Sequence, residues 1–86
     1  MEDIKEKSAD EMFEELGYRR VNYCGIGVMA TRHLEKDEIC YEIGAGVYYI
    51  LMTPEYVYKQ TRSGFGCLIN MQELKAINKK IEELGW

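Results

Sequence analysis

The hydrophobic positions of residues 8–18 recur with the period of an α-helix. The apolar stripe of this segment consists of Ala9, Met12, Phe13 and Leu16. Ser8 and Glu11 have the spacing of a capping box, in which each side chain satisfies a backbone N–H of the other residue. Gly17 suits the left-handed position at which a helix ends, and Tyr18 can then fold back onto Phe13. The pattern therefore predicts a first helix that ends at Gly17.

Residues 70–86 have the same design. Asn70 and Glu73 resemble a capping box with asparagine at the cap, and Gly85 is the predicted stop, after which Trp86 returns onto Ile81. The predicted apolar stripe is Met71, Leu74, Ile77, Ile81 and Leu84. The predicted solvent-facing side chains are Lys75, Lys79, Lys80, Glu82 and Glu83. This segment is predicted to be a second helix.

Between the two helices the hydrophobic period changes from 3.6 to 2, which is typical of strands. The predicted strands are 20–23, 26–31, 38–43, 47–52, 55–60 and the short segment 67–69. Residues 34–37 form a charged turn, 44–46 a glycine-rich turn and 62–66 a loop. Strands joined by tight turns predict an α+β fold, an antiparallel β-meander of about four or five strands with both helices packed on one face.

The segment 47–52 is apolar on both faces, although two helices can cover only one face of the sheet. If Val47, Tyr49 and Leu51 face the helices, the opposite face carries the remaining apolar side chains of this strand and the tyrosines of the next. This predicted second face consists of Tyr48, Ile50, Met52, Tyr56 and Tyr58. Exposed tyrosines and aliphatic side chains indicate a contact surface, because tyrosine buries a large area at low entropic cost. The alternative is that sheet curvature or the N-terminal segment covers this face.

The net charge of −4 is concentrated near the N-terminus, where residues 1–20 hold seven acidic and four basic side chains. Four acidic residues of the first helix lie off its apolar stripe, namely Asp10, Glu11, Glu14 and Glu15. An acidic chain is poorly suited to bind phosphate backbones, so no direct nucleic-acid binding is expected. It is better suited to bind a basic surface on another protein. The alternative is that these acids form an ordinary solvated helix face.

The sequence offers few residues for catalysis or metal binding. Cys24, Cys40 and Cys67 lack the spacing of a zinc site and are expected to be reduced thiols that pack as small hydrophobic side chains. His33 is the single histidine, and it lies beside a charged turn. We therefore expect no enzymatic activity, no metal site and no cofactor.

A chain of 86 residues has room for one hydrophobic core, so a single domain 1–86 is predicted, with 1–7 as a charged lead-in. The longest apolar stretch, 47–52, is far shorter than the roughly 20 residues of a membrane span. The N-terminus lacks the basic and apolar regions of a signal peptide. A soluble, cytoplasmic protein without a membrane partner is therefore expected.

The two ends of the chain, SADEMFEELGY at 8–18 and MQELKAINKKIEELGW at 71–86, carry a family resemblance. They resemble the ends of small, mostly uncharacterised proteins encoded by phages and prophages of low-GC Gram-positive bacteria. The middle of the chain departs from that pattern. The resemblance implies a phage-encoded accessory protein that acts in the cytoplasm of the infected bacterial host, and it supplies no catalytic residues.

The combined hypothesis is a non-enzymatic inhibitor of the anti-CRISPR type. It would bind a host defence protein, such as the RNA-guided CRISPR effector nuclease Cas9, and occlude a nucleic-acid-binding or other functional surface. The contacts would come from the acids of the first helix or from the tyrosine face. The alternative is a structural or regulatory module of a phage or prophage that forms a homodimer through the tyrosine-rich face.

Overall fold

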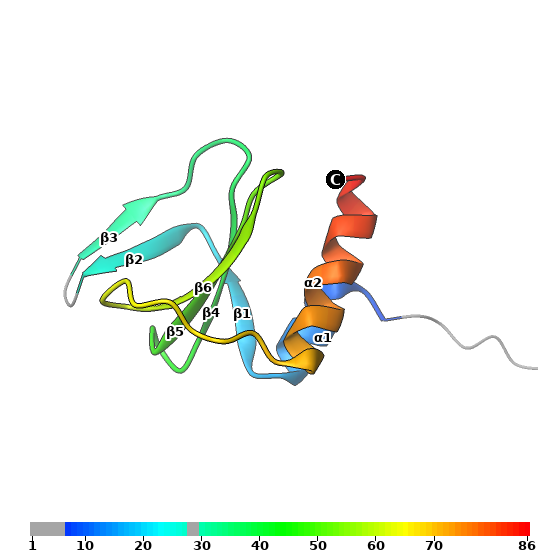
Figure 1. Ribbon diagram of the computed structural model, residues 1–86, viewed down its shortest axis with the longest axis horizontal. Helices are drawn as coiled ribbons and strands as arrows, with labels where there is room; N and C mark the ends of the chain where they lie inside the picture. Colours follow the sequence, from blue (N-terminus) through cyan, green and yellow to red (C-terminus); the bar gives the residue numbers. More distant parts are fainter. Residues whose placement is uncertain (1–6, 28–29) are drawn as a thin grey trace, which may run out of the picture.

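The computed structural model describes residues 7–27 and 30–86 and has an α+β architecture, as predicted (Figure 1). Its elements are α1 (Ala9–Glu15), β1 (Tyr18–Val21), β2 (Tyr23–Gly27), β3 (Ala30–His33), β4 (Ile39–Ile43), β5 (Tyr48–Met52), β6 (Val57–Thr61) and α2 (Met71–Leu84). Most of the lead-in 1–7, and the centre of the strand predicted over 26–31, lie outside the described residues. Neither helix of the described chain is long and apolar enough to cross a membrane.

The strands form a four-stranded antiparallel sheet in the order β1-β4-β5-β6 and a separate two-stranded hairpin, β2-β3. Strands β4, β5 and β6 follow one another as the predicted meander, but the hairpin is inserted between β1 and β4. The sequence predicted a break between strands at residues 24 and 25. In the structure the break is at Asn22, where the chain leaves the sheet and enters the hairpin. The prediction of a strand over 67–69 is wrong, because this segment forms no strand. Its backbone contact with β6 is a hydrogen bond from the N–H of Cys67 to the carbonyl of Lys59, at 2.8 Å.

The helix ends are as predicted. Both capping boxes form, and the two glycine stops, Gly17 and Gly85, adopt φ values of 94° and 73°. The ring of Tyr18 meets that of Phe13 edge-on, with centroids 5.9 Å apart. These short-range signals depend only on residues within one turn of each other, which explains why the sequence reveals them.

Both helices pack on one face of the four-stranded sheet (Figure 1). The buried residues of this first core are Phe13, Tyr18, Ile39, Tyr41, Ile50, Met52, Ala76 and Ile77. The rings of Phe13 and Tyr41 stack with their centroids 3.8 Å apart, which joins α1 to the central strand β4. The backbone N–H of Ala9 also donates to Glu83 at 2.9 Å, so the helices are joined by polar contacts as well.

The predicted apolar stripe of α2 is only partly correct. Ile77 is buried, but Met71, Leu74 and Leu84 are exposed. Lys80, predicted to face solvent, is buried instead. Its ammonium group lies 3.4 Å from the Asp10 carboxylate and so remains paired. The buried face of α2 therefore differs from its predicted apolar stripe. It includes Lys80, because Asp10 of α1 supplies a carboxylate partner there.

A second core lies on the opposite face of the sheet, under the β2-β3 hairpin (Figure 1). Its buried residues are Val21, Cys24, Cys40, Tyr49 and Leu51, with Tyr23 and Leu34 packed against them. Gly25 makes this contact possible, since a Cβ atom there would lie 2.7 Å from the Tyr49 ring. The hairpin thus covers the face that the sequence analysis left open.

Candidate functional site

The predicted composition of the tyrosine-rich face is partly wrong. Ile50 and Met52 are fully buried and belong to the core beneath the helices, so neither side chain is available to a partner. The alternation in β5 is the opposite of the assumed one, because Tyr49 and Leu51 turn toward the hairpin. Both faces of the sheet are covered, so a strand that is apolar on both sides can be buried in either orientation. The sequence of β5 therefore does not determine which side chains face the helices.

The three predicted tyrosines are exposed, but they do not share one face. Tyr48 lies on the helix side of the sheet, and the Lys59 ammonium group makes a cation–π contact with its ring, 4.8 Å from the centroid. Tyr58 pairs with Leu51 in the register and therefore lies on the hairpin side. Tyr56 lies in the connection between β5 and β6 and is 54% exposed. The sheet face on which a homodimer was predicted is thus occupied by the hairpin.

The acidic residues of α1 are close together but largely engaged within the chain. The Tyr41 hydroxyl donates to Asp10, and Lys80 lies near the same carboxylate. Burial alone would raise the pKa of Asp10, but these two partners outweigh it and lower the pKa. Glu11 accepts from the backbone N–H of Ser8, as the capping box requires.

Glu15 is bound to Lys7 at 2.5 Å, whereas Glu14 is exposed. Lys7 and Lys80 therefore offset part of the negative charge of α1. Glu11, Glu14 and Glu15 nevertheless remain exposed, so the prediction that they contact a partner stays a prediction.

Tyr56 and Tyr58 instead line a pocket of about 380 Å³ between the hairpin and β6, here called the tyrosine pocket. Its lining residues are Cys24, Gly25, Ile26, Arg32, Leu51, Tyr56, Tyr58, Gln60 and Gly64. Ile26 is 57% exposed at this site, and the Tyr58 hydroxyl donates to the carbonyl of Gly64 at 3.3 Å. Exposed apolar side chains around a concave site are typical of contact surfaces.

A second pocket, of about 300 Å³, shares Tyr56 with the first and is here called the acidic pocket. Its lining residues are Glu35, Lys36, Asp37, Glu38, Thr53, Pro54, Glu55 and Tyr56. Arg32 binds both carboxylate oxygens of Glu38, at 2.8 and 3.0 Å, and these bonds lower the pKa of Glu38. Four carboxylates and one ammonium group thus adjoin the tyrosine pocket.

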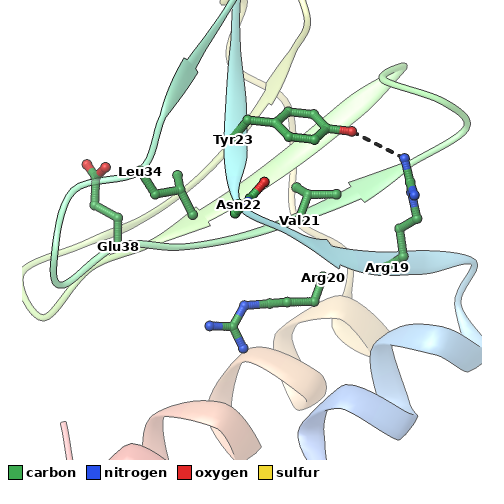
Figure 2. Close-up of a pocket in the computed structure, with 7 residues that line it drawn as sticks. All are labelled: Arg19, Arg20, Val21, Asn22, Tyr23, Leu34 and Glu38. Atoms are coloured by element: carbon green, nitrogen blue, oxygen red, sulfur yellow. Dashed lines mark hydrogen bonds between the residues drawn. The ribbon is translucent and has the colours of Figure 1, made fainter.

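A third cavity, of about 570 Å³, lies at the bend between β1 and β2 (Figure 2). Arg19 and Arg20 both line it, but neighbouring residues of a strand point to opposite faces. Arg20 extends on the side of the helices, with its guanidinium 5.9 Å from the Tyr41 ring centroid. Arg19 donates to Tyr23 at 3.2 Å (Figure 2) and to Glu42 at 2.7 Å. The two guanidinium groups therefore do not converge on a common anion.

Glu42 is a buried carboxylate in β4, within the strand predicted over 38–43. It is 3% exposed and accepts hydrogen bonds from Arg19 and from the Tyr23 hydroxyl, the latter at 3.1 Å. Burial would raise the pKa of Glu42, but its donors lower it. Burial and the nearby Glu42 raise the pKa of Tyr49 to about 12, and Arg62 donates to the Tyr49 hydroxyl at 3.0 Å. The network joins the hairpin to the sheet.

The structure also reveals residues that sequence reasoning missed. Phe65 and Leu68, in the connection between β6 and α2, and Met71, the first residue of α2, are among its most exposed large hydrophobic side chains. Ile26, Cys24 and Gln60 meet in the tyrosine pocket only because the hairpin folds over the sheet. No short-range pattern brings these distant residues together. Over residues 7–27 and 30–86, no group of three or more His, Cys, Asp or Glu side chains could hold a metal ion.

Comparison of the chain with family models, curated proteins and solved structures found no match. The resemblance of the two ends to phage proteins therefore stays a prediction. Function must be argued from the pockets themselves.

Proposed function

We propose that the protein is a binding protein that occupies a basic, nucleic-acid-binding surface of another protein. The contact surface is formed by the tyrosine pocket and the acidic pocket together. One observation carries this proposal: Tyr56 is exposed and lines both pockets, so an aromatic anchor stands directly beside four carboxylates.

The two pockets supply complementary parts of a protein contact. Exposed aromatic side chains at a concave site are the residues that most often dominate binding free energy. Neighbouring carboxylates speed association with a basic surface and discriminate against acidic partners. Glu55 precedes Tyr56 in the chain and lines the acidic pocket with it, so one short segment presents both properties.

The family resemblance points to the class of target. A phage-encoded protein of this kind would act on a host defence effector in the bacterial cytoplasm, and an RNA-guided CRISPR nuclease has the required basic channel for nucleic acid. By occupying that channel, the protein would prevent target DNA from binding. In this proposal the carboxylates of the acidic pocket face lysines and arginines of the target.

The test is a DNA-binding assay with a purified nuclease–guide complex from a Gram-positive host. Wild-type protein is expected to reduce binding of labelled target DNA in a concentration-dependent way. Tyr56→Ala and Glu55→Lys should each weaken this inhibition by about tenfold or more, as expected for a central contact residue. Glu14→Lys is the matched control, because it makes the same charge change as Glu55→Lys on the exposed side of α1.

Full inhibition by Tyr56→Ala together with loss of inhibition in Glu14→Lys would overturn the assignment of the surface. Absence of any complex between the wild-type protein and the nuclease would overturn this class of target. The mass of the protein in solution, measured over a range of concentrations, tests separately for self-association.

A further inference from the structure

Two thiols meet beneath the tyrosine pocket. Cys24 on β2 and Cys40 on β4 are both buried in the second core, and each thiol shifts the pKa of the other. Cys24 also lines the pocket, whereas Cys40 does not. A small molecule that enters the pocket therefore meets Cys24, and a second thiol lies in the same core. Both cysteines are free in this structure.

The surroundings of Cys24 favour its thiolate. The thiol of Cys40 is the largest cause that lowers the pKa of Cys24 below the ordinary value of 9.0, although burial opposes it. The Gln60 amide donates to the Cys24 sulfur at 3.0 Å, and the same nitrogen is held by the Gly25 carbonyl at 3.1 Å. The amide is thereby fixed in a position that stabilises negative charge on sulfur.

The charged groups around this sulfur come from the neighbouring elements. Arg32 lies opposite Cys24 in the β2-β3 register, and its positive charge favours the thiolate. Glu38, the partner of Arg32, acts in the opposite direction. The neighbouring Cys24 thiol and burial raise the pKa of Cys40, so the proton is favoured on Cys40 when Cys24 is the thiolate.

We propose that Cys24 is a nucleophile that reacts with a small hydroperoxide in the tyrosine pocket, and that Cys40 then resolves the product to an intramolecular disulfide. This site goes beyond the proposed function and does not depend on it.

The first step forms a bond between the Cys24 sulfur and the distal peroxide oxygen while the O–O bond breaks. The thiolate becomes a sulfenic acid, and the leaving oxyanion takes up a proton to become water or an alcohol. In the second step the Cys40 sulfur attacks the sulfenic sulfur. An S–S bond forms, the S–O bond breaks, and the departing hydroxide leaves as water with the Cys40 proton. The hydroperoxide supplies both oxidising equivalents.

A Cys67→Ser background simplifies the test, because Cys67 is the third cysteine and lies outside the pocket. This variant is treated with hydrogen peroxide, and its peptides are mapped by mass spectrometry without reduction. The expected product is a Cys24–Cys40 disulfide within one chain. When Cys40→Ser is added, the disulfide should disappear and a dimedone adduct should form at Cys24. Adding Cys24→Ser instead should leave Cys40 unmodified.

A measurement on the unsubstituted protein guards against variants that fail to fold. Iodoacetamide labelling of Cys24 in the native state should reach half its maximal rate below pH 9, the ordinary pKa of a thiol, whereas Cys40 should be labelled only after denaturation. Labelling of Cys24 that also requires denaturation would overturn the proposal. So would peroxide oxidation that appears only as disulfides between chains or at Cys67.

Discussion

The hydroxyl of Tyr18 donates a 2.7 Å hydrogen bond to Oε2 of Glu73, a residue 55 positions away in the chain. Lys59 reaches both oxygens of the same carboxylate, at 3.1 and 3.0 Å. Glu73 also accepts from the backbone N–H of Asn70 at 3.0 Å, which completes the capping box of α2. One buried carboxylate therefore joins β1, β6 and the start of the last helix.

Glu73→Ala is expected to lower the free energy of unfolding by about 3–5 kcal/mol, because it removes the cap and leaves the buried Lys59 ammonium unpaired. Glu73→Gln keeps a polar group at the same position and should cost less. Chemical denaturation followed by far-UV circular dichroism measures both changes. Glu82→Ala is the control, since this exposed residue should change stability by about 0.5 kcal/mol or less. Equal effects of Glu73→Ala and Glu82→Ala would contradict the role assigned to Glu73.

Acid should destabilise the protein through the same group. Burial raises the pKa of Glu73, but its hydrogen bonds and Lys59 lower it below the ordinary value of 4.5. The pKa values of Asp10, Glu38 and Glu42 are lowered as well. Below the ordinary carboxyl values the unfolded chain binds more protons than the folded one, so stability falls as pH decreases.

The free energy of unfolding should therefore be nearly constant from neutral pH down to about pH 5, and should decrease progressively below that. Glu73→Gln cannot take up this proton, so its decrease should be shallower than that of the wild type. Denaturation curves at a series of pH values measure the slope. Identical slopes in the two proteins would mean that the pKa of Glu73 does not change on folding.

The sequence predicted the parts of this fold that depend on neighbouring residues. Both capping boxes, both glycine stops and the strand 39–43 have their signals within a few positions. The side of the sheet that each residue faces could not be predicted in the same way. An apolar strand such as β5 can be buried in either orientation once both of its faces are covered. Which of its side chains face the helices then depends on the position of the hairpin.

The candidate site shows the same limit. Tyr56 and Tyr58 are exposed as predicted, but Ile50, which was predicted to share their face, is buried under the helices. Ile26 and Glu35 could not be assigned to the same surface, because the fold of the hairpin over the sheet brings them near Tyr56. Lys80 was misplaced for a related reason, since its partner Asp10 belongs to the other helix.

The contact between the hairpin and the sheet can be tested at Gly25. An added Cβ would lie 2.7 Å from the buried ring of Tyr49, so Gly25→Ala must displace either the ring or β2. The expected loss of stability is about 1–3 kcal/mol, as for other overpacked sites. Gly66→Ala is the matched control, because nothing lies within 4 Å of a Cβ at that position. If both variants have the stability of the wild type, the hairpin does not pack on the sheet as described.

Substitutions in the core and on the proposed contact surface should have opposite effects on stability and binding. Ile50→Ala should lower the free energy of unfolding by about 2–5 kcal/mol, since it opens a cavity in a fully buried site beneath the helices. Tyr56→Ala removes a half-exposed side chain and should change stability by no more than about 1 kcal/mol. Thermal or urea denaturation of both variants measures the difference. Binding to the nuclease should show the opposite order, provided that Ile50→Ala is assayed where it remains folded. A large loss of stability in Tyr56→Ala would mean that this tyrosine supports the fold and that its effect on binding is indirect.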